Sequence, residues 1–249
     1  MRVGCPKEIK AQEFRVGLTP AAVNELVRRG HFVTIETNAG QGAGFVDSDY
    51  EKEGADIVGS AKEVFDKADM IVKVKEPQAI ERKMLKSGQL LFTYLHLAPD
   101  PEQTHDLIDS GCTAIAYETV TDLNGGLPLL APMSEVAGRL APQMGAWTLQ
   151  KANGGRGVLL GGVPGVAPAK VLVLGGGVVG TNAARVAAGM GADVTVLDKS
   201  LSRLRYIDDV FGHLFKNGYA SQKATTELAS QADLILSLIH ISEPTRHTR

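Results

Sequence analysis

The sequence has few of the features that mark membrane, secreted or nucleic-acid-binding proteins. No stretch approaches the roughly 20 uninterrupted apolar residues of a membrane span, and residues 1–10 lack the apolar core of a signal peptide. The formal net charge is −2 and no basic run stands out, so there is no electrostatic reason to expect nucleic acid or a membrane surface as partner. We therefore expect a cytoplasmic chain with neither partner.

Cysteine is also scarce, whereas glycine is abundant. The two cysteines, Cys5 and Cys112, lie far apart and show no metal-ligand spacing, so we expect two buried, reduced thiols and no metal site. Of the 28 glycines, many lie between residues 125 and 191. Such a segment indicates tight turns or close approach of the backbone to a ligand.

Short apolar runs alternate with helix-like segments over the first half of the chain. Thr19 and Pro20 are typical of a helix start, and Gly30 of a helix end. This alternation predicts an α/β fold with a parallel sheet covered by helices. The expected strands are residues 2–5, 32–36, 70–74, 90–94 and 113–117, and the expected helices are residues 20–29, 62–67, 77–85 and 101–110.

The strand and helix alternation is interrupted near residue 125, where Asn124-Gly125-Gly126 is typical of a turn. Residues 132–152 predict one long helix, capped by Ser134 and kinked or split at Pro142. A second α/β run follows. It comprises strands 170–174, 193–197 and 232–236 and helices 180–189 and 202–211. We expect two domains, residues 1–130 and an incomplete Rossmann domain at 131–237, with 238–249 set apart.

The strongest local motif is glycine-rich. Gly175-x-Gly177-x-x-Gly180 follows an apolar strand and opens a helix, and the next strand ends at Asp198. In such a motif one glycine makes the turn, the next admits a pyrophosphate, and the third packs helix against strand. Asp198 would bind a ribose hydroxyl and repel a 2′-phosphate, which favours NAD over NADP. A turn that binds nothing is the alternative. Arg203 would touch the adenosine side or be a solvated helix residue.

Candidate reagents in the first domain follow the ends of expected strands. Lys75 comes after residues 70–74, and His96 after residues 90–94. Ligands of open α/β sheets bind at this edge. Lysine can polarise a carbonyl, histidine can exchange a proton, and Arg15, before a helix start, can clamp a carboxylate. Together they suit a small keto or amino acid. Taken singly, each has a plainer reading: a surface arginine, strand-end lysines at Lys73 and Lys75, and a structural histidine.

Several segments taken together resemble a known family. PKEIK, RVGLTP, VKVKEP, LFTYLHLAP, LAPMSEVAGRLA and VLGGGVVGTNAARVAAGMGADVTVLD match bacterial alanine dehydrogenases in order and spacing, from Met1 to about Leu236. The wider family includes the NAD-binding subunit of proton-translocating transhydrogenase. VKVKEP and LFTYLHLAP favour the dehydrogenase.

The resemblance implies reversible, NAD-dependent oxidative deamination of L-alanine to pyruvate and ammonium, usually by homohexamers. His96 would be the general acid/base, Lys75 the catalytic, substrate-binding lysine, and Arg15 the carboxylate clamp. The resemblance also implies a set of cofactor-binding residues: Met133, Ser134, Gly175, Gly177, Val179, Gly180, Asp198 and Arg203.

The end of the sequence departs from the family. SLIHISEPTRHTR does not continue the strand and helix pattern, and we expect residues 238–249 to be non-native. Without the family's remaining segments, including its catalytic aspartate, the chain should fold poorly or bind NAD weakly and turn over little. The alternatives are an NAD-binding transhydrogenase subunit, or an inactive fragment that joins full-length partners. An opine-type or saccharopine-type dehydrogenase is a weaker alternative.

Overall fold

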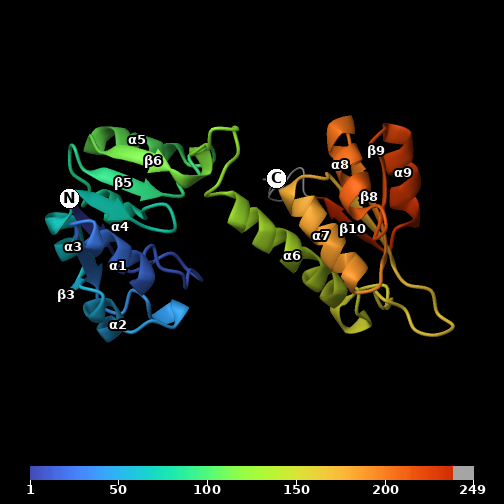
Figure 1. The fold of residues 1–249 in the computed structure, drawn as a ribbon, viewed down its shortest axis with the longest axis horizontal. Coiled ribbons are helices and arrows are strands. Elements are labelled where there is room, and N and C mark those ends of the chain that lie inside the picture. The colour runs from blue at the N-terminus through green and yellow to red at the C-terminus, as the bar shows by residue number, and fades with distance from the viewer. Residues whose placement is uncertain (238–249) are drawn as a thin grey trace, which may run out of the picture. The chain divides into compact units, whose positions relative to one another are not determined.

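The computed structural model describes residues 1–237 and divides into two α/β units (Figure 1). The first unit is Met1–Leu129, and the second begins at Leu130. Each is built around its own parallel sheet, which confirms the predicted fold class. The expectation for residues 238–249 lies outside the described residues.

The first unit contains a six-stranded sheet in the order β3-β2-β1-β4-β5-β6, with every neighbouring pair parallel. Strand β1, in the middle of the sheet beside β4, pairs with β2 on one side, where Val3 is opposite Val33, and with β4 on the other, where Val3 is opposite Met70. The strands are β1 (Arg2–Cys5), β2 (Phe32–Glu36), β3 (Asp56–Val58), β4 (Met70–Val72), β5 (Leu90–Thr93) and β6 (Thr113–Ala116). The helices are α1 (Pro20–Arg28), α2 (Asp47–Lys52), α3 (Ala61–Lys67), α4 (Ala79–Arg82) and α5 (Pro101–Ser110), with 3₁₀ turns η1 (Gln41–Ala43) and η2 (Tyr117–Thr119).

The start and end of α1 follow the predicted capping chemistry. The hydroxyl of Thr19 accepts a hydrogen bond from the backbone N–H of Ala22 at 3.3 Å, and Pro20 occupies the first helical position. Gly30 then takes the left-handed conformation with φ +81°. Both signals are confirmed.

Two elements of the first unit escaped the sequence pattern. Helix α2 is six residues long and largely polar, and β3 has only three residues, so neither shows a clear hydrophobic period. The helix predicted at residues 77–85 is confined to Ala79–Arg82. The strand predicted at 70–74 ends at Val72, because Val74 and Lys75 donate their N–H groups to a carboxylate instead of a neighbouring strand.

The second unit contains a four-stranded parallel sheet in the order β10-β7-β8-β9 within the described residues. Its elements are α6 (Ala131–Thr148), η3 (Lys151–Asn153), β7 (Lys170–Leu174), α7 (Val178–Gly189), β8 (Asp193–Asp198), α8 (Leu201–Phe211), β9 (Lys216–Tyr219), α9 (Gln222–Gln231) and β10 (Leu234–Ser237). β9 and α9 were not predicted. β9 contains Asn217-Gly218, a pair typical of turns, and α9 has no buried residue.

The long helix α6 corrects two predictions. It begins at Ala131 and Ser134 does not cap it, because Pro132 in the first turn already sets the helical backbone. Pro142 does not split the helix, which runs on to Thr148. Helix α6 packs closely along α7: a Cβ at Gly138 would lie only 2.4 Å from the carbonyl oxygen of Val179. This packing supports the helix across the proline.

The structure tests two expectations drawn from composition: that both thiols are buried, and that no segment is long and apolar enough to span a membrane. Cys5 is fully buried in the core, where burial raises its pKa to about 12, and Cys112 is only partly buried, which corrects the second half of that prediction. Both cysteines are free. Among residues 1–237, no helix combines the length and the apolar character needed to cross a membrane.

Candidate substrate and dinucleotide sites

The glycine-rich loop of the second unit connects β7 to α7. Gly175 directly follows β7 and has φ +96°, a conformation that side chains rarely adopt. Gly177 is the N-cap of α7, which is 12 residues long. The first turn of this helix therefore presents its unpaired N–H groups at the loop, together with the positive end of the helix dipole. This is the local geometry that binds phosphate groups.

Two glycines of the loop differ in the space that a side chain would have. A Cβ at Gly180 would lie 1.7 Å from the carbonyl oxygen of Gly175, so close packing alone requires glycine there. A Cβ at Gly177 would meet nothing within 4 Å, and Gly177 has a φ of −65° that any residue adopts. Folding therefore does not require glycine at Gly177. Open space beside a helix N-terminus fits the pyrophosphate of a dinucleotide.

Asp198 and Arg203 both fasten this loop. The carboxylate of Asp198 accepts hydrogen bonds from the backbone N–H groups of Gly176 at 2.6 Å and Ser200 at 2.7 Å. The guanidinium of Arg203 donates to the carbonyl oxygen of Gly176 and to the hydroxyl of Thr181. Arg203 is thus not a solvated helix residue, because its guanidinium is hydrogen-bonded within the protein. It ties α8 to the glycine loop. Contact of Arg203 with the adenosine side of a cofactor stays a prediction.

The other residues predicted to bind the cofactor lie at helix starts. Met133 and Ser134 are in the first turns of α6, and Val179 is in the first turn of α7. All three are partly buried. Their contact with a cofactor stays a prediction.

In the first unit, two lysines that follow β4, Lys73 and Lys75, have different environments. Lys73 is fully buried, and its ammonium group lies 3.1 Å from a carboxylate oxygen of Glu8 and 2.7 Å from one of Glu81. Lys75 is only partly buried, and its backbone N–H donates to Glu8. Of the two, Lys75 has the accessibility that a substrate ligand needs, whereas Lys73 belongs to the core.

His96 lies beyond the end of β5 on a left-handed backbone, with φ +49°. The carboxylate of Glu118 accepts hydrogen bonds from the backbone N–H groups of Leu95, at 3.0 Å, and His96, at 2.8 Å. The ring of Tyr94 stacks on the imidazole, with 6.0 Å between centroids. The side chain of His96 is 48% exposed, so the imidazole is held by its surroundings and remains open to a reactant.

Glu76 joins His96 to Lys10. One carboxylate oxygen lies 3.3 Å from Nδ1 of His96, and the other accepts from the ammonium group of Lys10. Burial by itself would raise the pKa of Glu76, but the hydrogen bond from Lys10, a backbone hydrogen bond and the charge of Lys10 together outweigh it, and the pKa lies below its usual range. The ionised carboxylate can hold the imidazole by Nδ1 and leave Nε2 for proton exchange.

Arg15 lies in the loop between β1 and α1 and is paired with Glu13 through Nε, at 2.8 Å, and Nη2, at 2.6 Å. The hydrogen bond from Arg15 lowers the pKa of Glu13, and the charge of Lys75 adds to this shift. Glu13 therefore pairs with Arg15 and also feels the charge of Lys75. Arg15 also lines a hollow of about 310 Å³ that includes neither Lys75 nor His96.

The structure adds carboxylates that the sequence patterns did not single out. Glu8, Glu76 and Glu118 contact the backbone or side chains of the predicted reagents. Glu76 and Glu118 follow β4 and β6 at the same carboxyl edge of the sheet as Lys75 and His96. The strand-end rule that found the cations would have found these two as well. Glu8, three residues after β1, lies at the same carboxyl edge and follows the same rule.

Each unit is built on a parallel sheet. The second unit carries the glycine-rich loop at residues 175–180, here called the dinucleotide cradle, and the first carries charged residues at its sheet edge. This combination is typical of two-domain dinucleotide-binding proteins. Family comparison makes the class specific. Residues 4–137 match the alanine dehydrogenase/PNT N-terminal domain, and residues 141–246 match the alanine dehydrogenase/PNT C-terminal domain. The chain belongs to the alanine dehydrogenase/PNT family.

Individual relatives agree with this assignment. The chain is 55% identical over 239 residues to an alanine dehydrogenase of Halomonas elongata, covering 96% of this chain and 64% of that protein. A solved L-alanine dehydrogenase matches with TM-score 0.89 and 54% identity, over 94% of this chain and 65% of that one. A transhydrogenase from Sinorhizobium meliloti matches with TM-score 0.79 and 25% identity, over 95% and 69%. The chain thus spans just under two thirds of the length of these dehydrogenases.

Proposed function

We propose that this chain carries the substrate-binding half and the dinucleotide cradle of an NAD-dependent alanine dehydrogenase, which converts L-alanine reversibly to pyruvate and ammonium. The observation that supports this most is the pairing of Lys75 and His96. They follow the neighbouring parallel strands β4 and β5, and both are accessible. Relatives named alanine dehydrogenase, at 50–55% identity, agree with this reading.

The side chains of the first unit suit the substrate group by group. The planar guanidinium of Arg15 matches a carboxylate. The ammonium of Lys75 can stabilise negative charge on the oxygen of pyruvate or of the carbinolamine that precedes it. His96 can take a proton from water that attacks the imine carbon, and return one to the departing amine. When bound, NAD would accept the hydride from Cα of alanine.

The proposed preference for NAD over NADP depends on Asp198. Its carboxylate lies at the end of β8 and is hydrogen-bonded to Gly176 in the glycine loop. A ribose hydroxyl can donate to such a carboxylate, whereas a 2′-phosphate would meet like charge. From the family we also infer a homohexamer that works in the cytoplasm. Sedimentation analysis tests the hexamer.

An assay of NADH oxidation tests the proposed activity. We would compare the 249-residue chain with a chimera in which residues 1–237 continue into the C-terminal segment of the Halomonas elongata relative. In the chimera, oxidation should require both pyruvate and ammonium, and NADH should be preferred over NADPH by about tenfold or more. A His96→Asn chimera is the matched control and should lose turnover while still binding NADH.

Other outcomes point to the alternative readings. NADH binding without any oxidation that depends on pyruvate and ammonium, in chain and chimera alike, would favour an NAD-binding transhydrogenase-like subunit. Activity confined to the chimera would mean that the 249-residue chain alone lacks part of the catalytic machinery. Equal use of NADPH would overturn the role given to Asp198.

A further inference from the structure

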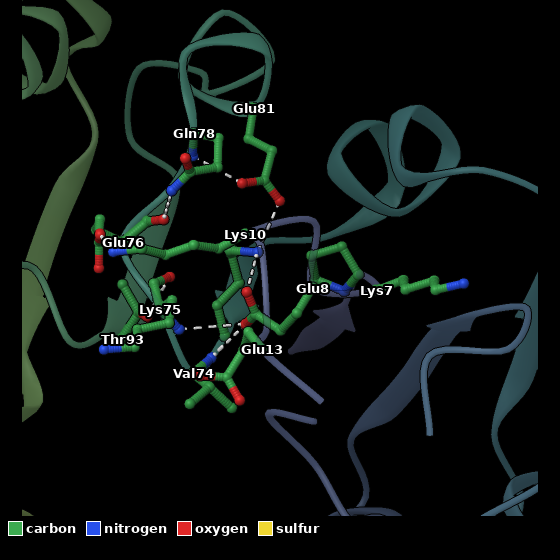
Figure 2. Close-up of polar contacts among 12 residues, drawn as sticks. Lys7, Glu8, Lys10, Glu13, Val74, Lys75, Glu76, Gln78, Glu81 and Thr93 are labelled. Carbon is green, nitrogen blue, oxygen red and sulfur yellow. Dashed lines mark hydrogen bonds and ion pairs between the residues drawn. The ribbon is translucent and has the colours of Figure 1, made fainter. Parts of the chain in front are cut away.

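Glu8 occupies an unusual position for a buried carboxylate. It follows β1 by three residues, and its side chain is only 3% exposed. One oxygen accepts from the backbone N–H groups of Val74, at 2.6 Å, and Lys75, at 3.2 Å (Figure 2). The other oxygen accepts from the ammonium of Lys73 at 3.1 Å.

The backbone at the end of β4 explains why a carboxylate is needed. Toward β5, pairing continues past Val72, because the N–H of Lys73 donates to the carbonyl oxygen of Phe92. Toward β1, pairing has ended, since β1 stops at Cys5 and the next residue is proline. The carboxylate of Glu8 takes the place of the missing strand and satisfies the N–H groups of residues 74 and 75.

The remaining members of the cluster hold Glu8 in place. Lys73 is fully buried between Glu8 and Glu81, and Glu81 accepts from the N–H of Gln78 at the start of α4. Two carboxylates flank one ammonium, so their attraction raises the pKa of Lys73 although burial opposes it. Burial raises the pKa of Glu81, although the charge of Lys73 opposes that rise.

We propose that Glu8 is a positioning residue of the substrate site, which sets the Lys75 ammonium by fixing the backbone of residues 74 and 75. This inference rests on the proposed function for the role of Lys75. The side chain of Glu8 is 3% exposed, and both of its oxygens already accept hydrogen bonds from the protein. Its effect is transmitted through two charge-assisted hydrogen bonds to the residue pair that carries the reagent.

The alternative is that the cluster only stabilises the core. Glu81→Gln is a matched control, because it removes the same charge from the same buried cluster and leaves the acceptor at Val74 and Lys75 intact. Two readouts on the 249-residue chain separate the roles: amide hydrogen exchange at Val74 and Lys75, which needs no ligand, and the affinity for pyruvate in calorimetric titrations with NADH present.

In Glu8→Ala, exchange at Val74 and Lys75 should accelerate by about tenfold relative to other amides of the first unit, and pyruvate affinity should fall by about tenfold. Glu81→Gln should change both by less than about threefold. If Glu8→Ala does not fold, Glu8→Gln replaces it. Gln retains a weaker, neutral acceptor and should show a smaller effect in the same direction.

Equal effects of the Glu8 and Glu81 variants on exchange and on pyruvate affinity would overturn the proposal, because a purely structural cluster predicts that result. Exchange that stays slow at Val74 and Lys75 in Glu8→Ala would also overturn it. If neither the unsubstituted chain nor the chimera binds pyruvate, the proposed substrate is wrong, while the exchange rates still decide whether Glu8 holds the backbone of Lys75.

Discussion

The two units position their candidate sites by different means. In the second unit the backbone makes the site: Gly180 brings α7 against β7, and Gly177 leaves open space at the helix start. In the first unit charged side chains make the site, and they are held by buried or half-buried carboxylates such as Glu8 and Glu76. The dinucleotide cradle should therefore be sensitive to added volume, whereas the substrate site should be sensitive to lost charge.

Removal of the buried cation should have the largest effect on stability. Lys73→Met leaves Glu8 and Glu81 buried without their counter-charge, so the free energy of unfolding of the first unit should fall by about 3–5 kcal/mol. Hydrogen exchange in peptides from β1 and β4 measures this loss. Fluorescence of Trp147, the single tryptophan, which lies in the second unit, should stay unchanged.

Lys62→Met is the control variant, because Lys62 belongs to an exposed ion pair, and it should leave hydrogen exchange unaltered. A Lys73→Met chain as stable as the unsubstituted one would contradict the account.

Added volume should produce the next largest effect, in the other unit. Gly180→Ala forces a methyl group against the carbonyl of Gly175, which should destabilise the second unit by about 1–3 kcal/mol or more. Gly177→Ala is the control, because its methyl group meets nothing. Urea unfolding followed by Trp147 fluorescence compares them. Similar midpoints for both variants would show that packing does not distinguish these glycines.

A smaller effect is expected from the backbone conformation of His96. Its φ of +49° disfavours β-branched side chains, so His96→Val should destabilise the first unit by about 1–2 kcal/mol. Asparagine tolerates this conformation, and His96→Asn should unfold within about 0.5 kcal/mol of the unsubstituted chain. Thermal unfolding monitored by hydrogen exchange in the first unit gives both values. The expectation fails if Val and Asn are equally tolerated.

The smallest effect concerns an exposed charge. Hydrogen bonds from Lys62 and Lys86 lower the pKa of Asp66 from 3.8 to about 2. A carboxylate with a lowered pKa stabilises the fold above its unfolded pKa, and that contribution is lost as the pH falls through the folded value. Asp66→Asn should therefore melt slightly lower than the unsubstituted chain near pH 6, and the two melting temperatures should converge near pH 2. A gap that widened toward low pH would contradict this sign.

Much of the fold and half of the candidate site could be predicted because the signals were local. The glycine motif, the capping pair Thr19-Pro20 and the strand-end positions of Lys75 and His96 each lie within a few consecutive residues. The hydrogen-bond partners of Glu8 and Glu118 could not be assigned in this way. These partners lie 66 and 22 positions away along the chain, and only the strand order brings them together.

The misplaced elements have local causes as well. Ser134 was expected to cap α6, but Pro132 starts the helix earlier. The Asn217-Gly218 pair of β9 resembles a turn, and pairing with β8 overrides that tendency. Arg203 was expected near a ligand or in solvent. Folding brings the carbonyl oxygen of Gly176 close to it, and the guanidinium donates a hydrogen bond to that oxygen.

We infer that the dinucleotide and the substrate are held by separate units through separate chemistry. Calorimetric titration of NADH and of pyruvate into Gly177→Ala and Lys75→Met tests it most directly. We predict that Gly177→Ala loses NADH affinity by about tenfold or more without unfolding, and that Lys75→Met keeps NADH binding but loses pyruvate binding with NADH present. Normal NADH affinity in Gly177→Ala, or loss of NADH binding in Lys75→Met, would contradict the account.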